Sequence, residues 1–414
     1  MEQQKRGIVV VGPAWHSCGS YQLFKSQIDT YQSLGFEAYF VAIPTSTRRG
    51  DNSEEFWDYY LRMTSDLPAT DRGQAKVKRS SLHSLSMYVE LVRCLGRTVC
   101  YYRTFPARFA ILPDTLRGFL SSHRVSVVHC NHYFNLPAAR RIRDSIRNTG
   151  QNTRIILETH DIQSRHLIDI DPQHPLTGLD GKYNDYFADE LRCSMDADEF
   201  VHLNEDESSI FGEALPNKKH HLIYPSVARP ISKTSKQPDI DFLIVSSANM
   251  PNYRSLCWFL DEVWDDEINS IASLRVVGNV DYIFQDEKDQ RYEKYRSIFV
   301  GRVENLSDWY RRARTVVIPV TEGQGIAVKT LEAMSYGRPF LYTPMALRGF
   351  SSRPEAKKLF GACRDAAEFK KALRKRLSSS RQKEVNKPAL DIYNSLFSPE
   401  VYREKIRNLI FDGN

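Results

Sequence analysis

The sequence predicts an α/β protein made of two doubly wound parallel-sheet domains in tandem. Strand-length apolar runs alternate with helix-length amphipathic segments, and this alternation stops at a proline-containing stretch and then restarts. At 414 residues the chain is also too long for one ordinary core. We therefore expect an N-terminal domain over 1–227, a linker over 228–239, a C-terminal domain over 240–395, and a closing helix over 396–414 that packs back on the first domain.

The first domain is expected to begin with the apolar strand 7–11, which is too short to cross a membrane and follows a polar, charged start. Its other expected elements are a helix at 21–34, strands at 37–43, 125–129, 154–158 and 199–203, and helical material from Ser53 to Val99. Polar or small residues follow the later strands, where the carboxyl ends of a parallel sheet open into functional loops.

The second domain follows a change in composition, because Pro225, Pro230 and Pro238 interleave with Ser, Thr and Lys. Its expected elements are strands at 241–245, 274–277, 297–301 and 315–320 and a helix at 256–263. No short-period repeat is present, which excludes a solenoid.

Composition and charge exclude several classes of protein. Hydrophobic residues make up 41% and charged residues 26%, as in a globular enzyme, and no apolar run reaches the ~18 residues that a membrane span needs. Seven scattered cysteines without a C-x-x-C pair argue against a disulfide framework and a zinc ribbon. The net charge of +6 is mild and its basic clusters fit solvated helix faces, so we expect a cytoplasmic protein that binds no nucleic acid.

The segment 321–339 carries the most chemistry. A strand runs into a glycine-rich turn, and a helix from about Ile326 to Tyr336 is stopped by Gly337 and Pro339. Glycines let the backbone approach a ligand closely, while the free N–H groups and the dipole of a helix start attract an anion. This pattern is neither a P-loop nor a G-x-G-x-x-G fingerprint.

Two helical side chains extend this expected anion site. Lys329 lies about one turn beyond Gly325, and helical side chains lean toward the helix N-terminus, so its ammonium points at the same anion. Glu332 lies on the same face and can accept two hydrogen bonds from the hydroxyls of a ribose. Together they fit a nucleotide diphosphate, although Lys329 and Glu332 also fit an ordinary surface pair.

At this segment the chain resembles the retaining glycosyltransferases of the GT-B architecture, specifically glycosyltransferase family 4. The pattern shared is G-x-G-I-x-x-K-x-L-E-A-M-x-x-G-x-P, supported in order by 246–260 and 299–310; the resemblance covers about 240–347 well and is weaker before it. It implies two Rossmann-like doubly wound domains facing a central cleft. It also implies transfer of a sugar from a nucleotide diphosphate, with retained configuration and no metal ion or other cofactor.

The resemblance assigns residues to roles. Those expected to bind the donor are Gly19, Asn252, Arg302, Val303, Gly323, Gln324, Gly325, Ile326, Lys329 and Glu332, and those expected to act in catalysis are His160, Glu322 and Lys329. Lys329 and the amides of Gly325 and Ile326 would stabilise the leaving diphosphate, and the loop of Arg302 would lie against the base or touch phosphate. The family often carries two glutamates separated by seven residues, but the first position is Gln324 here, with Glu322 two residues before it. The residue that contacts the donor sugar therefore stays open.

Three histidines, His129, His132 and His160, lie at or just after strand ends in the first domain. His160 with Asp161 is the first candidate for contacting sugar hydroxyls or the acceptor, and structural histidines are the alternative for all three. The H-x-x-H spacing from His129 to His132 is a weak signal for a metal.

Two other functions fit the same pattern: a nucleotide-sugar epimerase of GT-B architecture, and a catalytically silent sugar- or nucleotide-binding module. For the transferase we expect a glycan or a lipid-linked acceptor. Aromatic and basic residues interleave from Tyr88 to Phe109 and could rest on the inner membrane surface, although core packing explains such aromatics more often. The sequence does not specify the oligomeric state.

Overall fold

The structure, a computed structural model, falls into two compact units. Residues described are 4–16, 19–46, 53–77, 89–90, 92–148, 150–170, 173, 181–228, 238–287, 290–379 and 385–411. The first unit is Met1–Tyr224 with Arg403–Asn414, and the second is Pro225–Tyr402. The expected linker 228–239 lies mostly outside the described residues, because 229–237 are not among them.

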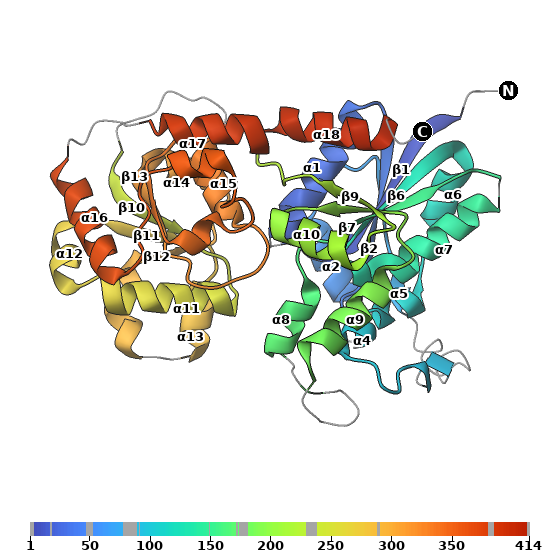
Figure 1. The fold of residues 1–414 in the computed structure, drawn as a ribbon, viewed down its shortest axis with the longest axis horizontal. Coiled ribbons are helices and arrows are strands. Elements are labelled where there is room, and N and C mark those ends of the chain that lie inside the picture. The colour runs from blue at the N-terminus through green and yellow to red at the C-terminus, as the bar shows by residue number, and fades with distance from the viewer. Residues whose placement is uncertain are drawn as a thin grey trace. The chain divides into compact units, whose positions relative to one another are not determined.

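The first unit is built on a seven-stranded parallel sheet in the order β3-β2-β1-β6-β7-β8-β9 (Figure 1). Its strands are β1 (Lys5–Pro13), β2 (Glu37–Ile43), β3 (Asp71–Gln74), β6 (His123–Asn131), β7 (Arg154–Glu158), β8 (Glu199–His202) and β9 (Lys219–Leu222). Ile8 to Val11 are fully buried, as expected of a parallel strand that is covered on both faces. This confirms the doubly wound first domain.

Helices connect these strands and complete the core. They are α1 (Gly19–Ser33), α2 (Glu54–Met63), α4 (Val99–Tyr102), α5 (Phe105–Phe109), α6 (Asp114–Ser122), α7 (Leu136–Arg147), α8 (Gln163–Ile170), α9 (Tyr183–Ser194) and α10 (Glu205–Ala214). Side-chain caps start two of them, since Ser53 accepts from Phe56 N and Asn204 from Glu207 N. The last part of α18 (Pro399–Phe411) also belongs to this unit, where Arg154 donates to the carbonyl of Leu409.

The expectation of helical material from Ser53 to Val99 is confirmed for α2 and wrong for 71–77. After α2 the chain forms β3 and then β4 (Lys76–Val77), which pairs antiparallel with the distant β5 (Ala110–Ile111). The sequence of β3 is Asp-Arg-Gly-Gln, which shows no apolar alternation because this strand is at the edge of the sheet. Residues 78–88 lie outside the described part.

The aromatic segment at the end of this stretch is partly core. Tyr101 and Phe109 are 6% and 7% exposed, so packing accounts for them, whereas Tyr88 is not among the described residues. Within the described residues, no helix is long and apolar enough to cross a membrane.

The second unit contains a five-stranded parallel sheet in the order β12-β11-β10-β13-β14. Its strands are β10 (Ile240–Val245), β11 (Leu274–Val277), β12 (Phe299–Gly301), β13 (Ala313–Ile318) and β14 (Phe340–Tyr342). Its helices are α11 (Met250–Trp258), α12 (Asp266–Ile271), α13 (Asp281–Glu287), α14 (Leu306–Arg312), α15 (Val328–Ser335), α16 (Ala366–Ser378) and α17 (Lys387–Ile392). Figure 1 shows this sheet between α14 and α15 on one face and α11 and α13 on the other. The second doubly wound domain is thereby confirmed.

Candidate functional site

The glycine-rich turn connects β13 to α15 in the second unit. Gly323 has φ 131° and Gly325 has φ 64°, a backbone region that favours glycine. A Cβ atom on Gly323 would come within 3.2 Å of Nη2 of Arg348, so there is also little room for a side chain at this position. The helix begins at Val328 rather than at Ile326, because Ile326 and Ala327 still belong to the turn.

Lys329 is fixed by a side chain from α11. Its Nζ donates to Oδ1 of Asn252 at 2.7 Å, and Asn252 in turn donates through Nδ2 to the carbonyl of Ser247 at 2.9 Å. Burial, with the nearby Arg348 guanidinium as the second cause, lowers the pKa of Lys329 to about 8, while Glu332 opposes the shift. The ammonium therefore lies in a partly desolvated setting, where it attracts an anion more strongly than it would in water.

Glu332 lies one helical turn further along α15. Its Oε2 accepts from the hydroxyl of Tyr310 at 2.8 Å, and the Tyr310 ring stacks on Tyr336 with centroids 4.6 Å apart. Burial raises the pKa of Glu332, with Tyr310 and Lys329 opposing the shift. The carboxylate thus has a fixed orientation and retains acceptor capacity for a ligand.

Two further cations lie next to the turn, and the sequence interpretation missed both. Arg254 Nη1 lies 3.3 Å from a carboxylate oxygen of Glu322, and Arg348 Nε donates to the carbonyl of Gln324 at 3.1 Å. Arg254 lies two residues after Asn252 on α11, so the stretch that indicated Asn252 could also have indicated Arg254. Arg348 has no such signal, because it follows β14 in a loop. The pairing of Glu322 with Arg254 gives this glutamate a partner outside the turn.

The loops of this unit share one edge of the sheet. Parallel strands end at the same edge, so the loop after β10 with Ser247, the loop after β12 with Arg302 and Val303, and the glycine-rich turn all lie there. Arg302 is exposed and Val303 half-buried, directly after Gly301 at φ 77°. The arrangement offers backbone N–H groups, cations and one oriented carboxylate to a ligand at this edge.

In the first unit, His132 and His160 hold an unusual backbone. They have φ 62° and 65°, and no other non-glycine residue in the described ranges has a positive φ. They follow the neighbouring strands β6 and β7, and their rings stack with centroids 4.1 Å apart. Such a conformation costs free energy and persists where the surrounding structure fixes it, which is typical of functional sites.

Asn131 determines which nitrogen of His160 carries the proton. Its Nδ2 donates to the carbonyl of Val11 at 3.2 Å and to Oε1 of Gln27 at 3.0 Å, while its Oδ1 accepts from Nε2 of Gln27 at 2.8 Å. That Oδ1 lies 2.7 Å from Nε2 of His160. Since a carbonyl oxygen only accepts, Nε2 of His160 carries the hydrogen, and Nδ1 keeps its lone pair when the ring is neutral. Burial lowers the pKa of His160 to about 4, so the ring is neutral near pH 7.

A buried carboxylate lies beneath this pair. Glu158 is 1% exposed; its Oε1 lies 3.4 Å from Nε2 of His160 and its Oε2 3.3 Å from Nε2 of His129. Burial opposes ionisation, but His129 and His160 together lower the pKa of Glu158. Tyr31 completes the network with a 2.5 Å hydrogen bond to Nδ1 of His129. We call this group the histidine network; it consists of Gln27, Tyr31, His129, Asn131, His132, Glu158 and His160.

Two more carboxylates hold the loop that carries His160. The hydroxyl of Thr159 donates to Glu207 at 2.9 Å, and Glu190 accepts the backbone N–H groups of Gln163 and Ser164 at 3.0 and 2.7 Å. Glu190 thereby satisfies the free donors at the start of α8. The position of His160 is fixed from both sides along the chain.

The remaining predicted residues of the first unit differ in burial. Gly19 is the first residue of α1 and is exposed; Asp161 is half-buried and accepts from the side chain of Gln163. His132 is 2% exposed, and neither ring nitrogen has a hydrogen-bond partner among the described residues. No group of three or more potential metal ligands occurs in that part of the chain either.

Two parallel-sheet units, each with its polar residues at the carboxyl edge of the sheet, define the GT-B fold. Residues 239–379, which include the glycine-rich turn, match the family Glycosyl transferases group 1. This match supports glycosyl transfer as the reaction class.

Solved structures agree with the fold over the whole chain. The Anabaena protein HepE in complex with UDP has a TM-score of 0.60 at 10% identity, covering 98% of this chain and 100% of that one. The pneumococcal O-GlcNAc transferase GtfA, with UDP and GlcNAc, has 0.59 at 10%, covering 99% of each. The lipopolysaccharide outer core galactosyltransferase WaaB has a TM-score of 0.56 at 15% identity, covering 99% of this chain and 100% of that one. No curated protein sequence matches.

Proposed function

We propose that this protein transfers a sugar from a nucleotide-diphosphate donor to an acceptor hydroxyl with retained configuration, as a hexosyltransferase. The observation that carries the proposal is the glycine-rich turn with Lys329 and Glu332 on one face of α15. The family match over the same residues supports it.

In this proposal the second unit holds the leaving group. The amides of Gly325 and Ile326 and the ammonium of Lys329 stabilise the negative charge that develops on the diphosphate as the glycosidic bond breaks. Asn252 keeps Lys329 in place, because its Oδ1 already orients the ammonium. Glu332 binds the ribose, and the loop with Arg302 and Val303 lies against the base.

The first unit supplies the side chains for the sugar and the acceptor. The neutral ring of His160 accepts a hydrogen bond at Nδ1 from a sugar or acceptor hydroxyl, since Nε2 is occupied by Asn131. The second unit has two catalytic candidates, Lys329 and Glu322. Because Lys329 binds the diphosphate in this proposal, Glu322 is the one that contacts the donor sugar. That role requires it to release Arg254.

The substrates are proposed from the solved neighbours and from the charges at the turn. The neighbours HepE and GtfA were solved with UDP, which makes a uridine nucleotide the first donor to test. No metal ion is needed in the proposal, since the cations at the turn come from the chain. We further propose a cytoplasmic protein that uses a glycan or lipid-linked acceptor, at or near the inner membrane surface.

Donor binding and donor hydrolysis across UDP-, GDP-, ADP- and dTDP-sugars test the proposal. We expect one nucleotide to be selected. The variant Lys329→Ala should lower turnover about 10²–10³-fold, the range found when one donor to a developing anion is removed. Glu332→Gln keeps an acceptor for Tyr310 but removes the charge, and should weaken nucleotide binding about tenfold.

The matched control is Lys375→Ala, which removes an exposed lysine from α16 of the same unit. It should behave as wild type in both assays. Failure of every nucleotide sugar to bind would overturn the proposal. Binding without turnover in the presence of any acceptor would favour the silent binding module, and interconversion of the donor sugar would favour the epimerase.

A further inference from the structure

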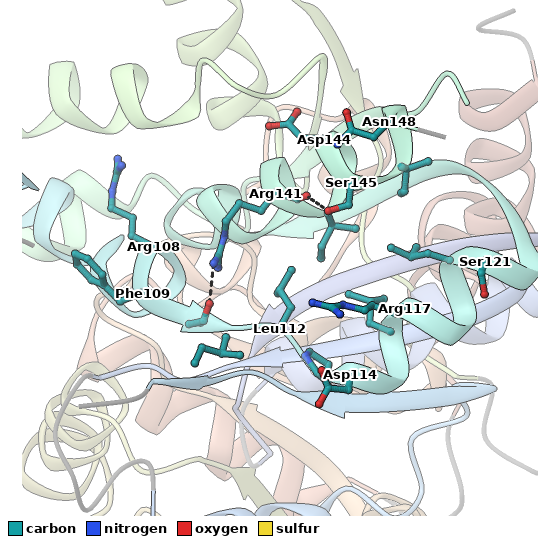
Figure 2. Close-up of a pocket in the computed structure, with 17 residues that line it drawn as sticks. Arg108, Phe109, Leu112, Asp114, Arg117, Ser121, Arg141, Asp144, Ser145 and Asn148 are labelled. Carbon is teal, nitrogen blue, oxygen red and sulfur yellow. Dashed lines mark hydrogen bonds between the residues drawn. The ribbon is translucent and has the colours of Figure 1, made fainter. Parts of the chain in front are cut away.

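A pocket of about 1050 Å³ opens between α6 and α7 in the first unit (Figure 2). Its walls come from α6, from the C-terminal half of α7, and from 108–113 before α6. Both helix parts lie next to the amino ends of strands, because α6 leads directly into β6 and α7 ends shortly before β7. The pocket therefore lies toward the edge of the sheet opposite His160, and its size is at the upper end for small-molecule sites.

The floor of the pocket is apolar. Leu116 and Leu120 are four residues apart on α6, and Ile142 and Ile146 are four apart on α7, so each helix directs one apolar row at the pocket. Leu116, Ile142 and Ile146 are at most 2% exposed and lie at the base, whereas Leu120 and Leu112 are half-buried and present the accessible apolar surface, with Leu112 between the helices (Figure 2). A hydrocarbon chain fits such a floor.

Guanidinium groups stand on this apolar surface. Arg141 donates to the carbonyls of Ala110 and Ala107 at 2.8 and 2.7 Å, which fixes its position (Figure 2). Its Nε is buried without a hydrogen-bond partner, and burial lowers the pKa of the group with no carboxylate to oppose it. Arg117, on α6, is exposed and forms no ion pair among the residues that the structure describes. Within the described ranges, neither of these two cations has a carboxylate counter-ion.

Neither acidic residue of the lining forms an ion pair with Arg117 or Arg141 in the part of the chain that the structure describes. Asp144 pairs with Arg140 at 3.7 Å and with Arg143 at 3.6 Å, and both of these arginines are absent from the lining. Asp114 lies in the first turn of α6, where the helix dipole favours a carboxylate. A third arginine of the lining, Arg108, already approaches Glu90 at 3.6 Å.

We infer that this pocket binds a single-chain anionic amphiphile, with its acyl chain on the apolar floor and its phosphate or carboxylate against Arg117 and Arg141. A neutral apolar ligand would cover the guanidinium of Arg141 without supplying a counter-ion, which is unfavourable. A small inorganic anion would leave the half-buried side chains of Leu112 and Leu120 in water. Only a ligand with both parts satisfies both surfaces, and the inference does not depend on the proposed sugar transfer.

Calorimetric titration with lysophosphatidic acid below its micellar concentration tests the inference, with lysophosphatidylcholine, monoacylglycerol and inorganic phosphate as comparators. Lysophosphatidic acid should bind at least tenfold more tightly than each comparator. Arg117→Glu should weaken its binding at least tenfold by replacing attraction with repulsion, and Leu120→Glu should do the same from the floor. Arg147→Glu is the matched control, since it reverses an exposed charge on α7 outside the lining and should bind as wild type.

Equal binding of inorganic phosphate or of monoacylglycerol, or no binding of lysophosphatidic acid, would overturn the inference. So would equal losses in Arg117→Glu and Arg147→Glu. Flotation with phosphatidylglycerol and phosphatidylcholine vesicles identifies the source of the ligand. Loss of phosphatidylglycerol binding in Arg117→Glu alone places the ligand in a membrane, whereas binding of dispersed lysophosphatidic acid without vesicle binding places it in solution.

Discussion

The glycine-rich turn of the second unit and the histidine network of the first are assembled from the sequence in different ways. The turn and its helix form one contiguous segment from Thr321 to Gly337, which side chains from elsewhere in the same unit, such as Asn252 and Tyr310, contact. The histidine network joins residues from α1, β6, β7 and the loops after them. Because the first depends on local geometry and the second on sheet topology, only the first can be interpreted from its sequence pattern alone.

The two regions also treat charge differently. In the turn, three cations, Arg254, Lys329 and Arg348, surround free backbone donors, so the region is prepared for an anion that comes from outside. In the histidine network, the buried Glu158 lies 3.3 Å from His129 and 3.4 Å from His160, so its neighbours are groups of the chain itself and not a ligand from outside. We infer that the glycine-rich turn provides binding energy and that the histidine network provides one oriented hydrogen-bond acceptor.

The largest expected effect separates these two contributions. His160→Ala should lower kcat about 100-fold or more, the usual range for a positioned proton-transfer or hydrogen-bonding group, and leave the affinity for the free nucleotide unchanged. Glu332→Gln should do the reverse. Steady-state kinetics and calorimetry with the nucleotide check both.

His221→Ala serves as the control for this comparison, because it removes a half-exposed histidine of the same unit that pairs with Glu199. It should retain wild-type kcat. If His160→Ala weakens nucleotide binding as much as Glu332→Gln does, the division of roles between the two regions is wrong.

A smaller effect, about tenfold on kcat at pH 7, is expected for Asn131→Asp. A carboxylate in place of the amide favours the imidazolium form of His160, so the pKa of that ring should rise from about 4 and Nδ1 should become protonated. Histidine NMR titration measures this pKa directly. The rate should recover as the pH increases, because loss of the proton restores the acceptor.

That recovery distinguishes a tautomer effect from damage to the core, which a higher pH would not repair. Asn131 is fully buried, so thermal melting must show that the variant is folded. An unchanged pKa of His160 together with an unchanged rate would show that Asn131 does not control the ring.

The sequence predicted the central strands of both sheets better than the strands at their edges. The apolar runs predicted most of the central strands, and the bounds of β7 and β11 agree with the expected 154–158 and 274–277. The edge strand β3 was missed, since a polar four-residue strand has no periodicity, and β9 and β14 were missed as well. The polar β3 lacks the apolar run that burial on both faces requires, whereas β14 is buried but only three residues long.

The candidate site divides in the same way. The pattern G-x-G-I-x-x-K-x-L-E indicated Lys329 and Glu332 as one group, and the structure places both on α15. Asn131, Gln27 and Glu158 could not be predicted as partners of His160, because their contacts depend on strand order. A positive φ at His160 is likewise invisible in the sequence, since non-glycine residues rarely adopt it.

A third, smaller effect concerns the pH dependence of the turn. The pKa of Lys329 is lowered to about 8, so the ammonium is lost as the pH rises through that value, and kcat/KM should fall severalfold above it. Arg348→Met removes a repelling charge and should move this limb to higher pH, whereas Glu332→Gln removes an attracting charge and should move it to lower pH. pH–rate profiles of the three proteins measure the order. Shifts in the same direction for both variants would show that Lys329 is not the titrating group.

The smallest expected effect tests how local the turn and its helix are. Gly337 has φ 58°, and its N–H donates to Met334 while that of Arg338 donates to Ala333, the pattern of a Schellman motif that ends α15. An added Cβ would meet only ordinary contacts, the nearest at 3.4 Å, so Gly337→Ala should cost only the backbone strain of about 1 kcal/mol. Melting of the second unit should fall by about 2–4 °C. Gly212→Ala inside α10 is the opposite control, because nothing lies near its Cβ and alanine favours a helix by about 0.5–1 kcal/mol. If both substitutions stabilise, the positive φ at Gly337 is not required, and the stop signal in the sequence acts through Pro339 instead.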